Sequence, residues 1–322
     1  MLLLLFVFIM LIVTLSVYFR LAGHYNIIDK PNNRSSHTYI TIRGGGIVFP
    51  VAALLWFLFY GFNQPWIIFA LLNLATISFL DDIKTLSAKI RILVHLLAVA
   101  ILFWQLGVFE MSFYVVLLAF LITIGWINAF NFMDGINGIT ALYGLVALCT
   151  FYLLNQSINY ISQNLILILI VSVLIFSFFN LRRRAKTFAG DVGSVTMAFL
   201  LAWLMISLMA KTGRLEYILF FAVYGIDSVI TILFRLWRLE NIFDAHRTHL
   251  YQFLSNELKW PHVLVSGLYG LIQVIINILV IYLINSKQMT STIFFIFSLV
   301  LVLGYLLIRT RITAIITQKP FI

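Results

Sequence analysis

Long apolar runs, separated by short polar segments, make up almost the whole chain. Most of the runs approach the roughly 20 residues, with about 17 tolerated, that a helix needs to span a bilayer. The eleven runs lie near 2–22, 45–61, 65–80, 92–108, 111–129, 137–154, 163–180, 192–209, 216–236, 262–284 and 291–308. This pattern predicts an all-α, polytopic bundle of ten or eleven transmembrane helices that forms one integral-membrane domain over residues 1–322.

The composition supports this fold class and excludes others. The chain is 63% hydrophobic and 10% charged, with a mean hydropathy of +1.07, and no soluble domain tolerates that balance. The net charge of +10 does not indicate nucleic acid as a partner, because the basic residues sit in short loops between apolar runs. The single Cys149 excludes a disulfide framework and a multi-cysteine metal site.

The distribution of basic residues predicts which loops face the cytoplasm. Of the 21 lysines and arginines, only Lys211, Arg214 and Lys287 fall outside one set of alternating loops and adjacent span ends. That set comprises 23–44, 81–91, 130–136, 181–191, 237–261 and the C-terminal tail. The positive-inside rule therefore predicts a periplasmic N-terminus and a cytoplasmic C-terminus.

Four polar segments interrupt the apolar runs, and all four fall on the predicted cytoplasmic side. They read FLDD at 79–82, NAFNFMDGING at 128–138, FAGDVGS at 188–194 and DAHRTHLYQ at 244–252. Ionisable groups beside apolar spans are costly, so they more often mark function than packing. We expect the four segments to converge on one active site at the cytoplasmic face.

Three aspartates are the candidate catalytic carboxylates. Asp81 and Asp82 are adjacent and repel each other unless a cation or a proton separates them; the alternative is a solvated helix end beside Lys84. Asp191 stands between glycines at the start of a span, where it is a candidate metal ligand. Its alternative role is a helix N-cap, and the two roles are compatible because a carboxylate has two oxygens.

The second polar segment carries Asn128, Asn131, Asp134 and Asn137 at intervals of three residues. Capping of a helix end explains one or two such groups, but four between two apolar spans need partners inside the fold. The interleaved glycines favour a broken turn over a continuous helix. We interpret the segment as a substrate-binding site.

The segment with His246, Arg247 and His249 suits the binding of phosphate oxygens, because protonated histidine and arginine donate several hydrogen bonds. The H-x-x-H spacing is weak evidence for zinc without further ligands. A plain solvated loop is the alternative.

The first polar loop contains His37, Arg43 and the triplet Gly44-Gly45-Gly46. A glycine triplet beside basic groups can cradle an anion with its backbone amides. A flexible turn with topogenic charge is the alternative.

Taken in order, RSSHT…RGGG, FLDD, NAFNFMDGING, FAGDVGS and AHRTHLYQ resemble the polyprenyl-phosphate N-acetylhexosamine-1-phosphate transferase superfamily, called glycosyltransferase family 4 in an older naming. The AHRTHLYQ form is similar to the branch that initiates O-antigen synthesis. Asn137 departs from the pattern, since many relatives have aspartate there.

The resemblance implies transfer of a sugar 1-phosphate from a UDP-N-acetylhexosamine to undecaprenyl phosphate, with release of UMP, in the bacterial inner membrane. It implies Mg²⁺, with Mn²⁺ as a substitute, held by Asp191 with Asp82 or Asp81 contributing. It leaves a homodimer open. The other implied roles are catalysis by Asp81, Asp82, His246 and His249, and substrate binding by His37, Arg43, Asn128, Asn131, Asp134, Phe188 and Arg247.

A secondary transporter or lipid flippase is the rival interpretation, because transporters also bury acids in broken helices. Their sites lie near the bilayer midplane and open to both faces in turn. Here the acidic motifs gather at one predicted face, which favours the enzyme.

Overall fold

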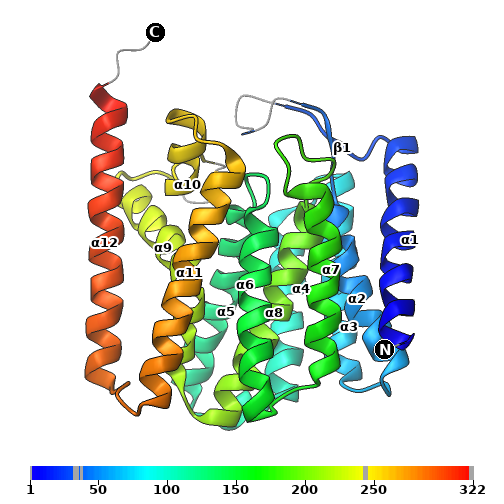
Figure 1. Ribbon diagram of the computed structural model, residues 1–322, viewed down its shortest axis with the longest axis horizontal. Helices are drawn as coiled ribbons and strands as arrows, with labels where there is room; N and C mark the ends of the chain where they lie inside the picture. The colour runs from blue at the N-terminus through cyan, green and yellow to red at the C-terminus, as the bar shows by residue number, and fades with distance from the viewer. Residues whose placement is uncertain (1, 32–35, 37–38, 242–245, 319–322) are drawn as a thin grey trace.

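The computed structural model describes residues 2–31, 36, 39–241 and 246–318, and most of these residues are helical (Figure 1). The longer helices are α1 (Leu2–His24), α2 (Val48–Phe59), α3 (Pro65–Ile83), α4 (Ala88–Gln105), α5 (Phe113–Met133), α6 (Ile139–Ile158), α7 (Gln163–Asn180), α8 (Gly190–Thr212), α9 (Ala222–Trp237), α11 (His262–Asn285) and α12 (Ser291–Gln318). The shorter elements are β1 (Ile28–Asp29), β2 (Thr41–Ile42), η1 (Gly45–Ile47), η2 (Val108–Glu110), η3 (Leu215–Phe221), α10 (Leu250–Gln252) and η4 (Phe253–Glu257).

Within this described part, ten helical stretches are long and apolar enough to cross a membrane, and the apolar stretch Gly45–Phe59 is shorter. The predicted all-α, polytopic bundle is therefore confirmed. The shorter stretch corresponds to the predicted span at 45–61. In Figure 1, α1 begins and α12 ends at opposite ends of the bundle, as an odd number of spans requires.

Helix α8 forms the centre of the bundle and α12 forms its edge. Most residues of α8 are buried, and its neighbours include α3, α5, α6 and α2. Helix α12 stands apart from the other helices in Figure 1, and Arg309 is its one buried residue. A helix that is apolar all round suits either position, so hydropathy alone does not separate them.

The glycine triplet packs against the start of α8. A Cβ on Gly46 would lie 2.2 Å from the Cα of Gly193, so only glycine permits this approach. The amides of Gly45 and Gly46 donate to the carbonyl oxygens of Phe188 and Ala189 at 2.8 and 3.0 Å. Because these two amides are already used, the predicted anion cradle is wrong for them: the triplet joins two segments of the fold.

The second polar segment is helical for longer than predicted. Helix α5 runs to Met133 and therefore includes Asn128 and Asn131, whereas Asp134 and Asn137 lie in the turn before α6. The broken turn is thus restricted to 134–138. Strands β1 and β2 form a small antiparallel hairpin, and β1 lies at the same end of the bundle as α10 (Figure 1).

Candidate active site

The carboxylate of Asp82, at the end of α3, caps the start of α8. Its Oδ1 accepts the backbone N–H of Asp191 at 2.9 Å, and its Oδ2 accepts that of Val192 at 3.0 Å. These amides belong to the first turn of α8, where no intrahelical partner exists and negative charge is favoured. Arg43 Nε also donates to Asp82 Oδ1 at 2.6 Å, and the Asp82 side chain has no exposed area. Asp82 is therefore fully engaged inside the protein.

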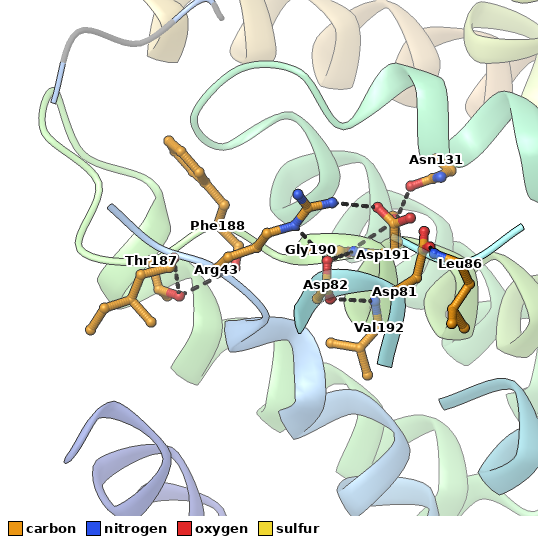
Figure 2. A network of polar contacts seen from close by, with 12 residues as sticks. Arg43, Asp81, Asp82, Leu86, Asn131, Thr187, Phe188, Gly190, Asp191 and Val192 are labelled. Carbon is orange, nitrogen blue, oxygen red and sulfur yellow. Dashed lines mark hydrogen bonds and ion pairs between the residues drawn. The ribbon is translucent and has the colours of Figure 1, made fainter. Parts of the chain in front are cut away.

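Asp81 and Asp191 lie beside this cap (Figure 2); Arg91 bridges these two carboxylates, whereas Arg43 bridges Asp191 to Asp82. Arg43 contacts Asp191 Oδ1 at 3.1 Å, and Arg91 contacts Asp81 Oδ2 at 2.9 Å and Asp191 Oδ2 at 3.6 Å. The backbone N–H of Leu86 donates to Asp81 Oδ1 at 2.5 Å. Three carboxylates thus share two guanidinium groups, which leaves negative charge to attract a cation.

A polar cavity of about 210 Å³ opens next to Asp191. It is lined by Asp29, Ser36, Arg43, Asn131, Asp134, Gly135, Ile136, Asn137, Asn180, Phe188, Gly190, Asp191, Gln252 and His262. The structure therefore brings five of the predicted site residues together around one space. The other described candidates do not line it: Asn128, for example, donates to Ile124 O of its own helix at 2.8 Å. His37 lies outside the described residues.

Asn131 and Asp134 are held in place by hydroxyl groups. Ser194 Oγ donates to Asn131 Oδ1 at 2.5 Å, which ties α5 to α8. Thr140 Oγ1 donates to Asp134 Oδ1 at 2.5 Å across the turn. Burial raises the pKa of Asp134 to about 6, although the hydrogen bond from Thr140 opposes this rise. Asp134 therefore changes charge close to the physiological range.

Asn137 stands between this cavity and a second one of about 640 Å³. Its side chain donates to Arg182 O at 2.9 Å, and its Oδ1 accepts no hydrogen bond from any residue that the structure describes. The second cavity shares Phe188 and His262 with the first and has a basic wall. The wall includes Arg183, Arg184 and Lys259. Together the two cavities offer acceptors, an aromatic ring and cations to a polar ligand.

The predicted histidine segment is packed against the protein. His249 is buried, and its Nδ1 lies 3.3 Å from Asp227 Oδ1 in α9. The rings of His246 and His249 have centroids 4.9 Å apart, and burial lowers the pKa of His246 to about 4. The alternative of a plain solvated loop is therefore wrong for His249.

An apolar cavity of about 620 Å³ lies between helices of the bundle and α12. Its walls come from α5, α8, η3, α9 and α12, and include Trp126, Met205, Phe221, Phe294 and Leu301. This cavity is therefore an apolar space between α12 and the rest of the bundle.

The sequence interpretation missed two residues. Arg91 has the appearance of a topogenic charge at the start of a span, but it contacts Asp81 and Asp191. Asp227 belongs to no recognised motif, although an acid in the middle of an apolar run was itself a signal of function.

Comparisons with known proteins agree with the resemblance carried by the motifs. Residues 64–209 match the family described as Glycosyl transferase family 4, a range that contains Asp81, Asp82 and Asp191. The chain is similar to the probable undecaprenyl-phosphate N-acetylglucosaminyl 1-phosphate transferase of Bacillus subtilis, with 26% identity over 94% of this chain and 89% of that protein.

Two further relatives are named for different sugars. The undecaprenyl-phosphate alpha-N-acetylglucosaminyl 1-phosphate transferase of Escherichia coli K12 is 27% identical over 76% of this chain and 74% of that protein. The phospho-N-acetylmuramoyl-pentapeptide-transferase of Lactococcus lactis is 28% identical over 66% of this chain and 72% of that protein. The similarity thus spans relatives that act on different sugars.

Proposed function

We propose, from the premise that this chain belongs to the polyprenyl-phosphate N-acetylhexosamine-1-phosphate transferase superfamily, that it transfers a sugar 1-phosphate from a UDP-N-acetylhexosamine to undecaprenyl phosphate. The products are UMP and an undecaprenyl-diphosphate-linked sugar that starts an O-antigen or another surface polysaccharide. The reaction takes place at the cytoplasmic face of a bacterial inner membrane.

One observation carries this proposal: a charged cluster borders a polar cavity at one end of a membrane bundle that also contains an apolar cavity. The nucleotide sugar is polar and anionic, so it suits the cavities lined by Arg43, Asn131 and Phe188. The acceptor carries a long prenyl chain, which suits the space between the bundle and α12. A transporter would not need both.

The donor set around Asp191 fits Mg²⁺, which proteins commonly bind through one or two carboxylates together with substrate phosphates. Among the described residues there is no cage of three or more acidic, histidine or cysteine side chains, and none is required for this mode. Asp191 with Asp81 is a better pair than Asp191 with Asp82, because Asp82 already accepts two amides and Arg43. When bound, Mg²⁺ neutralises charge that develops on the diphosphate.

The chemistry is a displacement at phosphorus. An oxygen of the lipid phosphate attacks the β-phosphorus of the UDP-sugar, the bond from that phosphorus to the bridging oxygen breaks, and UMP leaves with the electron pair. The acceptor is a phosphate monoester with a second pKa of about 6, so it needs little help from a base at neutral pH. Asp81 orients it or removes a residual proton, and Arg43 and Arg91 offset the negative charge.

Donor binding is assigned to the walls of the polar cavities. Phe188 provides a face for the uracil ring, since every base can stack on an aromatic side chain. Asn131, Asp134 and the unpaired Oδ1 of Asn137 accept hydrogen bonds from the UDP-sugar. His246 and Arg247 lie on the segment that would hold the phosphates.

The proposal is tested by incubating purified protein with undecaprenyl phosphate, Mg²⁺ and a panel of UDP-N-acetylhexosamines while UMP is measured. We expect UMP release that depends on both acceptor and metal, and the best donor identifies the sugar. The panel should include UDP-N-acetylglucosamine and the 6-deoxy sugars N-acetylfucosamine and N-acetylquinovosamine. Folded protein that releases no UMP with any donor would contradict the proposal and favour transport.

Direct attack is separated from a phospho-enzyme route by isotope exchange. If a carboxylate of the chain were the nucleophile, labelled UMP would enter UDP-sugar without any lipid acceptor. We expect no such exchange, because the acceptor phosphate is itself the nucleophile. Exchange at a rate close to turnover would overturn the direct route while leaving the overall reaction intact.

A further inference from the structure

Asp227 is a carboxylate with no exposed area inside the apolar stretch Leu215–Trp237. Its Oδ2 accepts Tyr269 OH at 2.6 Å, and its Oδ1 accepts Tyr305 OH at 2.9 Å. Oδ1 also accepts the backbone N–H of Leu250 at 3.1 Å and lies 3.3 Å from His249 Nδ1. A buried charge is costly, so a carboxylate with this many partners from three other segments has a purpose beyond packing.

The contact with Asp227 determines which ring nitrogen of His249 carries the proton. A carboxylate accepts hydrogen bonds, so the proton of the neutral ring lies on Nδ1, and Nε2 is the nitrogen left for another partner. Nε2 is buried and has no hydrogen-bond partner among the described residues. A buried polar atom without a partner in a well-connected network is the place where a ligand atom is expected.

The same network fastens α12 to the bundle. Arg309 is the buried residue of α12, and its Nη1 donates to Tyr305 OH at 2.7 Å and to Thr231 Oγ1 at 2.9 Å. Its Nη2 donates to Thr248 O at 2.8 Å, next to His249. A helix that faces lipid along its length therefore reaches the histidine segment through two polar side chains.

We propose that Asp227 is the positioning residue for His249, and that Tyr305 and Arg309 link α12 to the same hydrogen-bond network. Asp227 holds the ring by Nδ1 and thereby directs Nε2 to a phosphate oxygen of the substrates. A protonated ring donates Nε2–H to that oxygen, and Asp227 balances the positive charge on the ring. The inference rests on the proposed function only in that the substrates carry phosphates.

Two readouts test this role. In protein labelled with ¹⁵N-histidine, the His249 signals, assigned by their loss in His249→Gln, should show the proton on Nδ1. Adding UDP-N-acetylglucosamine with Mg²⁺ should shift the Nε2 signal. In Asp227→Asn, the response of Nε2 should be lost, and kcat should fall by about 10- to 100-fold, the effect typical of residues that orient a functional histidine. The KM for the UDP-sugar should change far less than kcat.

Matched tyrosine variants separate positioning from general stability. Tyr305→Phe removes one hydroxyl from Asp227, whereas Tyr143→Phe removes a buried hydroxyl that donates to Gln273, away from His249. We expect Tyr305→Phe to lower kcat by a few-fold and to broaden the Nε2 signal, and Tyr143→Phe to do neither. These two variants also keep the test open if Asp227→Asn does not fold.

The proposal is overturned if folded Asp227→Asn keeps the wild-type His249 signals and kcat. Equal losses in Tyr305→Phe and Tyr143→Phe would overturn the part assigned to α12. Absence of UMP release from the wild-type protein is a failure of the proposed function instead. In that case the protonated nitrogen of His249 in the resting protein still decides the role of Asp227.

Discussion

A cluster of three aspartates and a single buried aspartate differ in the groups that surround them. The first contains Asp81, Asp82 and Asp191, which share Arg43 and Arg91 and border a cavity. In the second, Asp227 is fully enclosed by hydroxyls, an amide and His249. The first retains negative charge beside an open space, so it can take a cation and phosphates. The second is closed around the Asp227 carboxylate, which acts through the His249 ring that it holds.

The three aspartates of the first cluster have different roles. The side chain of Asp191 is 16% exposed, whereas that of Asp82 is 0% exposed and accepts two amides of α8. The adjacent residues Asp81 and Asp82 thus have different contacts. Asp82 joins α3 to α8, whereas Asp81 shares Arg91 with Asp191.

The largest effect is expected for Asp191→Asn. Removing this charge should lower acceptor-dependent UMP release by about 10²- to 10³-fold, the size typical of losing one electrostatic contribution to a transition state. The elution profile on size exclusion should not change, because the Asp191 carboxylate contacts the side chains of Arg43 and Arg91 and caps no helix. Glu110→Gln, at a residue outside the site, is the control and should retain activity. Near-normal turnover in Asp191→Asn would remove this residue from the proposed metal site.

Asp82→Asn should act chiefly on stability. An amide has one acceptor oxygen and one donor group, so it leaves an N–H of Asp191 or Val192 facing another donor. We expect a loss of about 1–3 kcal/mol in the free energy of unfolding, measured as a lower thermal midpoint than that of Asp191→Asn. An unchanged midpoint with abolished turnover would show instead that Asp82 contacts the metal or substrate.

Phe188→Leu should raise the KM for the UDP-sugar by about 10-fold with a smaller change in kcat, because stacking on one base contributes about 1–3 kcal/mol. Phe188→Tyr keeps the ring and should restore the KM. The measurement is initial-rate kinetics with the donor varied at saturating acceptor. Equal KM values in the leucine and wild-type proteins would argue that uracil binds elsewhere.

The smallest effect concerns pH. The pKa of Asp134 is raised to about 6 by burial, and Thr140→Val removes the hydrogen bond that opposes this rise. If the ionised Asp134 carboxylate accepts a hydrogen bond from the UDP-sugar, the acidic limb of kcat/KM should move to higher pH by about half to one unit in Thr140→Val. The acceptor phosphate also ionises near 6, but it is the same in both proteins. An unmoved limb would mean that Asp134 need not be ionised.

Much of this arrangement follows from the cost of charge in an apolar chain. Asp81, Asp82 and Asp191 could be identified from sequence because acids at the ends of apolar spans are costly and more often mark function than packing. Their separate roles could not, because the cap formed by Asp82 joins residues more than one hundred positions apart. For the same reason a cap formed by Asp191 itself was a reasonable alternative, yet Asp191 lies in the first turn of α8.

The sequence interpretation failed where one residue type is compatible with both a structural and a functional role. Arg91 resembles a topogenic charge, and only its contacts show that it bridges two carboxylates. The predicted span at 111–129 ended too early, because the polar residues and glycines of 128–138 favoured a broken turn from Asn131 onward. The side chains of Asn128 and Asn131 are satisfied by Ile124 O and by Ser194, so the helix continues through them.

The central claim is that the sugar and its phosphate move together onto the lipid, and one labelling experiment tests it most directly. The protein is incubated with undecaprenyl phosphate, Mg²⁺ and the preferred UDP-sugar carrying ³²P at the β-position, and the lipid is extracted. The account predicts that the label enters the lipid in equal amount to the UMP released, and that Asp191→Asn prevents both. Label that remains in water-soluble UDP while sugar appears in the lipid would contradict it.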